Sequence, residues 1–183
     1  MKSLISILTI VLIFSCCSKK EDEQPTTPVD QLPPATQTGT NKVGCLVNGQ
    51  VLLPYQKNPF GSPAVVCFYQ YVNSQFDFSL GFSNDKVSGG IKGINVAAHK
   101  IEFQQGQTYQ LKSDDGNSAF ATYLDFSQNS DYKTTDLILG ELRITKLDQT
   151  NAIISGTFWF DAINNAGIKV EVREGRFDMQ YSQ

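Results

Sequence analysis

Beyond residue 42, apolar and polar residues alternate in several short segments, which is the two-residue period of a strand with one buried face. The alternation is clearest over residues 76–82 and 153–162, where phenylalanine occupies most of the apolar positions. No apolar pattern of helical period extends over ten residues. The sequence therefore predicts an all-β domain of about nine short strands, arranged as an antiparallel β-sandwich or a barrel.

Turn-forming dipeptides separate several of these segments. Asn48-Gly49 lies between two apolar runs, and the tight turns of hairpins favour residues that adopt positive φ. Glu174-Gly175 lies between two further alternating segments and predicts a second turn near the end of the chain. The last strands therefore form a terminal antiparallel meander in this interpretation.

The first fifteen residues have the pattern of a secretory signal. A short basic start precedes an apolar run over residues 4–14, which would rise only about 16 Å as a helix, half of a hydrocarbon core of ~30 Å. Residues 13–16 (Ile-Phe-Ser-Cys) resemble the bacterial lipobox, which implies cleavage before Cys16 and covalent lipid on Cys16. Cys17 fits the pattern less well. The alternative is an ordinary secretory signal followed by two incidental cysteines.

Lys20-Glu21-Asp22 follows the lipobox closely. It resembles the surface-export signal of Bacteroidota lipoproteins, which implies lipid anchoring in the outer membrane with the domain exposed at the cell surface. The alternatives are a solvated, charged start of a tether and a domain that faces the periplasm.

Residues 24–42 contain four prolines and five threonines and show no apolar periodicity. Such a segment buries too little surface to offset its ordering entropy. The sequence thus divides into a signal peptide (1–15), a lipidated disordered tether (16–42) and a single all-β domain (43–183).

Composition narrows the classes of function. Fifteen basic against 18 acidic residues give a net charge of −3, which argues against a nucleic-acid partner. A single histidine and the lack of a Cys/His cluster argue against a zinc site, and we expect no metal and no cofactor beyond the lipid on Cys16. The membrane is therefore the first expected partner, reached through the lipid anchor.

Cys45 and Cys67 remain in the domain, 22 positions apart. A disulfide is permitted outside the cytoplasm and would contribute about 3 kcal/mol in the chain-entropy account. Two buried free thiols are the alternative, because cysteine packs as a small apolar residue.

Trp159 and Asp161 are the candidate ligand-binding residues. Phe158 and Phe160 take the core face of their strand, so Trp159 should face outward beside polar neighbours. An exposed aromatic of this kind is suited to a glycan, a peptide or another envelope protein. An edge tryptophan covered by its neighbours is the alternative.

Catalytic candidates are weaker. His99 is the only histidine, and the chain has no Gly-x-Ser-x-Gly nucleophile motif. Asp125, Asp161 and Asp178 alternate with apolar neighbours, so we expect them to point outward. The sequence favours a non-enzymatic binding or structural module. A carboxylate-dependent glycan hydrolase, or a carrier of a small lipophile if the barrel is closed, are the alternatives.

Two groups of motifs resemble a known family. Residues 44–49 (Gly-Cys-Leu-Val-Asn-Gly) lie at the start of the domain, and residues 154–160 and 174–178 lie near its end. Together they resemble an uncharacterised family of Bacteroidota lipoproteins with a domain of unknown function. The resemblance implies an all-β, lipid-anchored envelope domain, and it implies no activity, substrate or site.

Overall fold

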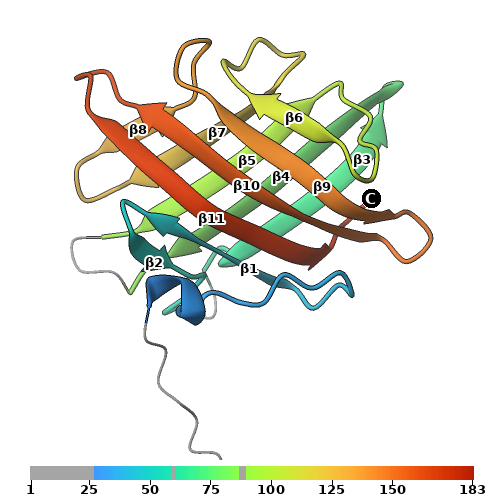
Figure 1. Ribbon diagram of the computed structural model, residues 1–183, viewed down its shortest axis with the longest axis horizontal. Coiled ribbons are helices and arrows are strands. Elements are labelled where there is room, and N and C mark those ends of the chain that lie inside the picture. The colour runs from blue at the N-terminus through green and yellow to red at the C-terminus, as the bar shows by residue number, and fades with distance from the viewer. Residues whose placement is uncertain (1–26, 59–60, 87–89) are drawn as a thin grey trace, which may run out of the picture.

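The computed structural model describes residues 27–58, 61–86 and 90–183 (Figure 1). These ranges contain eleven strands and one short 3-10 helix, which confirms the predicted all-β fold. None of the helical structure in them has the length and apolar character needed to cross a bilayer. Cys16 and the segment Lys20-Glu21-Asp22 lie outside the described residues.

In chain order the elements are η1 (Pro28–Gln31), β1 (Lys42–Val47), β2 (Gln50–Leu52), β3 (Val65–Val72), β4 (Gln75–Asn84), β5 (Lys92–His99), β6 (Thr108–Leu111), β7 (Ala119–Asp125), β8 (Ser130–Lys133), β9 (Gly140–Asp148), β10 (Ile153–Ile163) and β11 (Lys169–Gln180).

Ten of the strands form one continuous ladder in the order β2-β1-β11-β10-β9-β6-β7-β5-β4-β3, and β8 pairs with β7 and β10. It folds into two layers whose strands cross steeply, with β1, β9, β10 and β11 in front of β3, β4, β5 and β7 (Figure 1). β6 joins the layers, because it pairs antiparallel with β9 and parallel with β7. At the opposite end, Ser182 forms a bridge with Phe68 of β3. The result is a small, closed, barrel-like sandwich.

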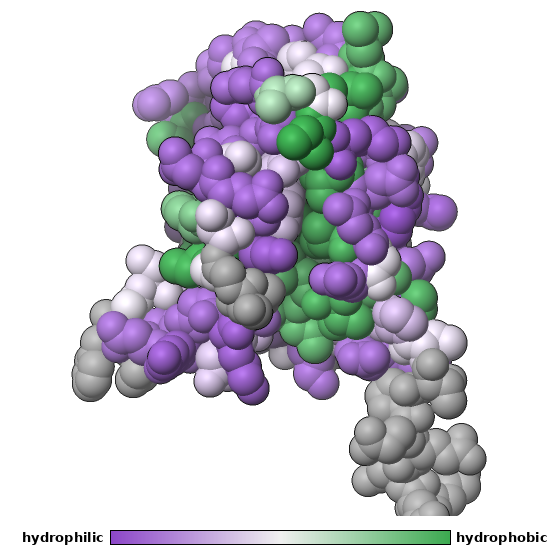
Figure 2. All heavy atoms as spheres, turned by 90° about the vertical axis from the view of Figure 1, so that its left-hand side faces the viewer, coloured by the Kyte–Doolittle hydropathy of each residue, from purple (hydrophilic) through white to green (hydrophobic). Residues whose placement is uncertain are grey.

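One side of this barrel carries β2, β8 and the beginning of β11, on the left of Figure 1. Figure 2 shows this side, where a band of hydrophobic side chains runs between hydrophilic flanks.

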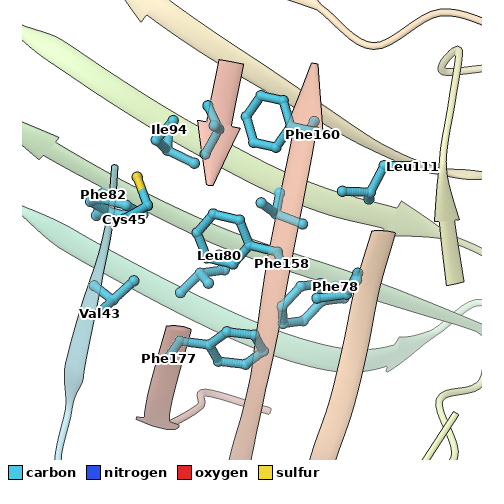
Figure 3. Close-up of a cluster of buried hydrophobic side chains, with 14 of the residues drawn as sticks. Val43, Cys45, Phe78, Leu80, Phe82, Ile94, Leu111, Phe158, Phe160 and Phe177 are labelled. Atoms are coloured by element: carbon cyan, nitrogen blue, oxygen red, sulfur yellow. The ribbon is translucent and has the colours of Figure 1, made fainter. Parts of the chain in front are cut away.

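Aromatic and aliphatic side chains from both layers fill the centre of the barrel (Figure 3). Phe78 and Leu80 of β4 and Phe158 and Phe160 of β10 are all almost completely buried, as the alternation in both segments predicted. Burial of side chains of this size contributes about 1.5–3 kcal/mol each, which makes this cluster the main source of stability.

The inward face of β7 differs from the sequence prediction. Ala119, Ala121, Tyr123 and Asp125 point into the barrel, and Asp125 is only 4% exposed, whereas Phe126 lies outside. The prediction that Asp125 points outward was wrong. Small alanines on the inner face leave space for the large side chains that fill the centre, so apolar size alone does not identify the buried face of this strand.

The expected turn at Glu174-Gly175 is also wrong, because β11 continues through it as a single strand. The register with β10 shifts there: Phe158 pairs with Gly175, and Phe160 pairs with Val172. Glu174 adopts a φ of 55°, so the dipeptide forms a β-bulge. The Asn48-Gly49 hairpin between β1 and β2 is confirmed, with positive φ at both residues.

Candidate functional site

The segment that precedes β1 covers the outer face of β11. Asp178 points outward from β11, yet it is only 1% exposed, because residues 36–40 lie over it. Its carboxylate accepts hydrogen bonds from the hydroxyls of Thr36 and Ser155, each at 2.7 Å, and from backbone N–H groups that include that of Gly39 at 2.7 Å. Residues 36–40 were expected to belong to a disordered tether, and this part of that prediction was wrong.

Burial alone would raise the pKa of Asp178. The hydrogen bonds from Thr36, Ser155, Gly39 and Thr38 outweigh that effect and lower its pKa well below the ordinary aspartate range. A carboxylate saturated with donors in this way stays ionised and has no free lone pair for a substrate. Asp178 is therefore a structural residue, and its expected exposure to solvent is not observed.

Trp159 of β10 lies on the outward face of the front layer, as the alternation predicted. Its indole N–H donates to Glu141 Oε2 of β9 at 3.2 Å. The guanidinium carbon of Arg173 lies 5.4 Å from the centroid of its ring. The residue is nevertheless 39% exposed, so a fixed aromatic surface remains open to a ligand.

Arg173 is held in place by the bulge in β11. Its guanidinium donates to the carbonyl oxygens of Phe160 at 3.1 Å and Val172 at 2.9 Å, and to Asp161 Oδ1 at 2.6 Å. Lys169 donates to the other oxygen of Asp161 at 3.0 Å. Asp161, which the sequence marked as a ligand-binding candidate, thus positions Arg173 beside Trp159.

The pKa of Asp161 is lowered in this arrangement. Partial burial would raise it, but the hydrogen bonds and positive charges of Lys169 and Arg173 prevail. Asp161 therefore remains a charged anchor for two cations.

A shallow groove surrounds Trp159, and we call it the Trp159 groove. It is lined by residues of β6, β9, β10 and β11 and by one residue of the N-terminal segment: Ala35, Thr108, Glu141, Arg143, Thr157, Phe158, Trp159, Arg173, Glu174, Gly175 and Arg176. Its three arginines outnumber its two glutamates. Arg176 pairs with Glu174 at 3.0 Å, whereas the guanidinium of Arg143 makes no hydrogen bond or ion pair with any residue that the structure describes.

The arginines of this groove were missed in the sequence. Each lies at an outward position of an alternating strand, where a charged residue is ordinary. Only the pairing of β9 with β10 and of β10 with β11 brings them to the same place, and the sequence does not disclose that pairing.

Cys45 and Cys67 are both buried, and their thiols are unbonded in the structure. Burial raises the pKa of Cys67 to about 12 and that of Cys45 further. Of the two alternatives, the structure therefore has the free thiols and not the disulfide.

His99 ends β5 and pairs with Asp77 of β4, with 2.9 Å between Nδ1 and Oδ1. The two residues are direct cross-strand neighbours, and both side chains are partly exposed. Within the described ranges, no group of three or more His, Cys, Asp or Glu side chains is placed to hold a metal ion.

The fold and the groove define a class: a small all-β domain with a packed, barrel-like core and an outward aromatic and arginine-lined groove. A protein-family model described as a domain of unknown function (DUF6252) matches residues 75–179, and the chain belongs to this family. The match runs from β4 to the end of β11 and includes Trp159, Arg173 and Asp178. Neither a curated protein nor a solved structure matches the chain.

Proposed function

We propose that the protein is a non-enzymatic binding module, lipid-anchored in the outer membrane and displayed at the cell surface, whose ligand lies in the Trp159 groove. The observation that supports binding is the exposed indole of Trp159, held between Glu141 and Arg173 on paired strands. Aromatic side chains with a fixed orientation contribute large contact areas at little entropic cost.

The charges of the groove favour a ligand with acidic groups. Arg173 pairs with Asp161 and Arg176 pairs with Glu174, whereas the guanidinium of Arg143 has no partner in the described part of the chain and is free to bind an acidic group. Arginine binds carboxylates and phosphates through two parallel hydrogen bonds. A glycan, a peptide or an envelope protein that presents such groups next to an apolar or planar surface would fit.

The hydrolase alternative has less support. Glycoside hydrolysis needs a carboxylic acid with a raised pKa to protonate the leaving group. The environments of Asp161 and Asp178 lower the pKa of each residue instead. The carrier alternative needs an open interior, whereas phenylalanines from both layers fill the centre of this barrel.

Trp159 offers a direct test of ligand binding, because it is the only tryptophan of the chain. Titration with acidic glycans and peptides should change its fluorescence and reach saturation. Arg143→Ala should weaken binding about 3- to 10-fold without changing the fold, since its side chain is exposed. Lys100→Ala, on the opposite layer, is the matched control. Calorimetry extends the test to Trp159→Ala, which lacks the fluorescent indole, and saturable binding that is unaffected by both Arg143→Ala and Trp159→Ala would refute the groove as the site.

The lipid anchor has its own test. Metabolic labelling with palmitate should give a lipidated protein, and Cys16→Ala should abolish the label while Cys17→Ala keeps it. Equal labelling of both variants would exclude Cys16 as the lipidation site.

Surface display is tested by protease treatment of intact cells. The native protein should be digested, and a variant with Lys20, Glu21 and Asp22 changed to alanine should be protected. Protection of both proteins would contradict surface exposure and favour a domain that faces the periplasm.

A further inference from the structure

A second pocket lies on the side of the barrel shown in Figure 2, away from the Trp159 groove. We call it the end pocket. It has a volume of about 320 Å³ and is formed by the β1–β2 hairpin, the beginnings of β5 and β11, the end of β7, and β8. Mouths of β-barrels are frequent sites for small ligands, and this volume is at the lower end of the usual range.

The end pocket has two unlike walls. Aliphatic side chains of the hairpin and of the first residues of β11 form one wall, which includes Val47, Leu52 and Val170. The other wall is polar and includes Lys92, Asp125 and the paired tyrosines of β7 and β8. A ligand that fits must therefore present an apolar face on one side and hydrogen-bonding groups on the other.

Tyr123 and Tyr132 are the key residues of the polar wall. They are direct cross-strand neighbours, with ring centroids 5.6 Å apart, and they are only 4% and 5% exposed. Neither hydroxyl makes a hydrogen bond with a residue that the structure describes. In the described ranges, every buried side-chain oxygen or nitrogen has a hydrogen-bond partner. The two tyrosine hydroxyls have no partner, so they are accessible to solvent, in the pocket that both tyrosines line.

The rings of both tyrosines are buried, whereas their hydroxyls reach the accessible space of the pocket, where water or a ligand can form hydrogen bonds with them. Burial also raises the pKa of Tyr123, so its hydroxyl keeps its proton and can donate it. Both tyrosines thus offer donors to an oxygen of a bound molecule.

Asp125 and Lys92 supply the complementary groups. Asp125 Oδ1 accepts from the backbone and hydroxyl of Ser127, whereas Oδ2 lies 4.0 Å from Lys92 Nζ. That separation is too long for a hydrogen bond, so each group can still bind a ligand. Their opposite charges offset one another, and Lys169 at the rim is already paired with Asp161 and Glu171.

We infer that the end pocket binds a small uncharged ring rich in hydroxyl groups, such as a single sugar unit. A sugar hydroxyl both donates and accepts, which suits the two tyrosine hydroxyls and Lys92 as donors and Asp125 as acceptor. The C–H face of the ring would pack on Val47, Leu52 and Val170. The near-neutral charge of the pocket favours a neutral sugar over an acid.

The full-length chain, kept in a detergent without a sugar headgroup, is the protein to test. Saturation-transfer NMR with millimolar glucose, galactose, mannose and N-acetylglucosamine should show contact for at least one sugar. Tyr123→Phe and Tyr132→Phe each remove one hydroxyl and should weaken that binding about 3- to 10-fold. Neither should lower the thermal stability, which separates loss of the site from loss of the fold.

Tyr71→Phe removes the hydroxyl of an exposed tyrosine on β3, outside both sites, so it is the matched control and should leave sugar binding unchanged. Sugar binding that is lost in Trp159→Ala but kept in both tyrosine variants would overturn the inference and assign the sugar to the Trp159 groove. Contact with octanoate and with none of the sugars would overturn it in favour of a lipophile. No contact with any probe would mean that the end pocket is a solvated opening of the barrel, and the proposal for the Trp159 groove would still stand.

Discussion

Asp178 Oδ1 accepts a hydrogen bond of 2.7 Å from the backbone N–H of Gly39, which lies 139 positions earlier in the chain. This contact joins the segment before β1 to the last strand. Thr36 and Thr40 donate their hydroxyls to the same carboxylate. The folded unit thus begins earlier than the first strand. A buried aspartate on β11 holds the preceding segment, together with the hydrogen bond from the backbone N–H of Gln180 to Asn41 and the burial of Leu32.

Replacement of Asp178 by alanine should destabilise the domain by about 2–4 kcal/mol. The change leaves the backbone N–H groups of Thr38 and Gly39 without their acceptor, and an unsatisfied buried donor costs about 1–3 kcal/mol. Urea denaturation measures the effect. Asp136→Ala, at an exposed position, should stay within about 0.5 kcal/mol of the native protein. An effect of Asp178→Ala as small as that of the control would contradict the structural role of this carboxylate.

The contribution of the Asp178 carboxylate to the free energy of unfolding should disappear in acid. Its pKa is lower in the folded protein than the ordinary aspartate value of about 3.9, so the unfolded chain binds the proton first. The stabilisation is therefore complete above about pH 4 and is lost as the pH falls through the folded-state pKa. The difference in unfolding free energy between the native protein and Asp178→Asn should narrow steadily below pH 4. A difference that stays constant from pH 7 to pH 2.5 would show that ionisation of Asp178 does not contribute.

The sequence predicted the alternating core strands well, and the reasons for its failures are physical. The core includes Phe78, Leu80, Phe158 and Phe160, as expected. Large apolar residues at every second position of a strand all lie on one face, and only burial of that face removes them from water. On β7 the same rule failed. Interior positions there are filled by alanines and a tyrosine, and the available space depends on the opposite layer, which no local pattern encodes.

The candidate site was predicted only in part. Trp159 was found because its phenylalanine neighbours determine which way it points. The position of Arg173 beside it depends on the bulge at Glu174, where two residues of β11 oppose one of β10. Such a register shift comes from strand pairing, and the dipeptide Glu-Gly is equally compatible with a turn.

Gly175 should tolerate no side chain. A Cβ at this position would meet the ring and the carbonyl oxygen of Phe158. Gly175→Ala should therefore cost at least about 2 kcal/mol, through displacement of a core ring and of the bulge that holds Arg173. Gly81→Ala on β4 is the control, because its Cβ would lie 3.8 Å from the nearest atom, in ordinary contact. Thermal denaturation compares the two, and equal stability of both variants would be inconsistent with the close approach of Phe158 to Gly175.

The thiols of Cys45 and Cys67 should be unreactive in the folded protein. Both are buried, and burial raises the pKa of Cys67 to about 12, so almost no thiolate forms at pH 8. In a chain with Cys16 and Cys17 changed to serine, a thiol reagent should react at least ~100-fold more slowly before unfolding than after it. Ser62→Cys, at an exposed bend, should react at once and serves as the control.

Both buried thiols should become available in urea without a reductant, because the structure contains no bond between them. If neither reacts until a reductant is added, the two cysteines form a disulfide after all, and the strands that carry them must lie closer together than the structure places them.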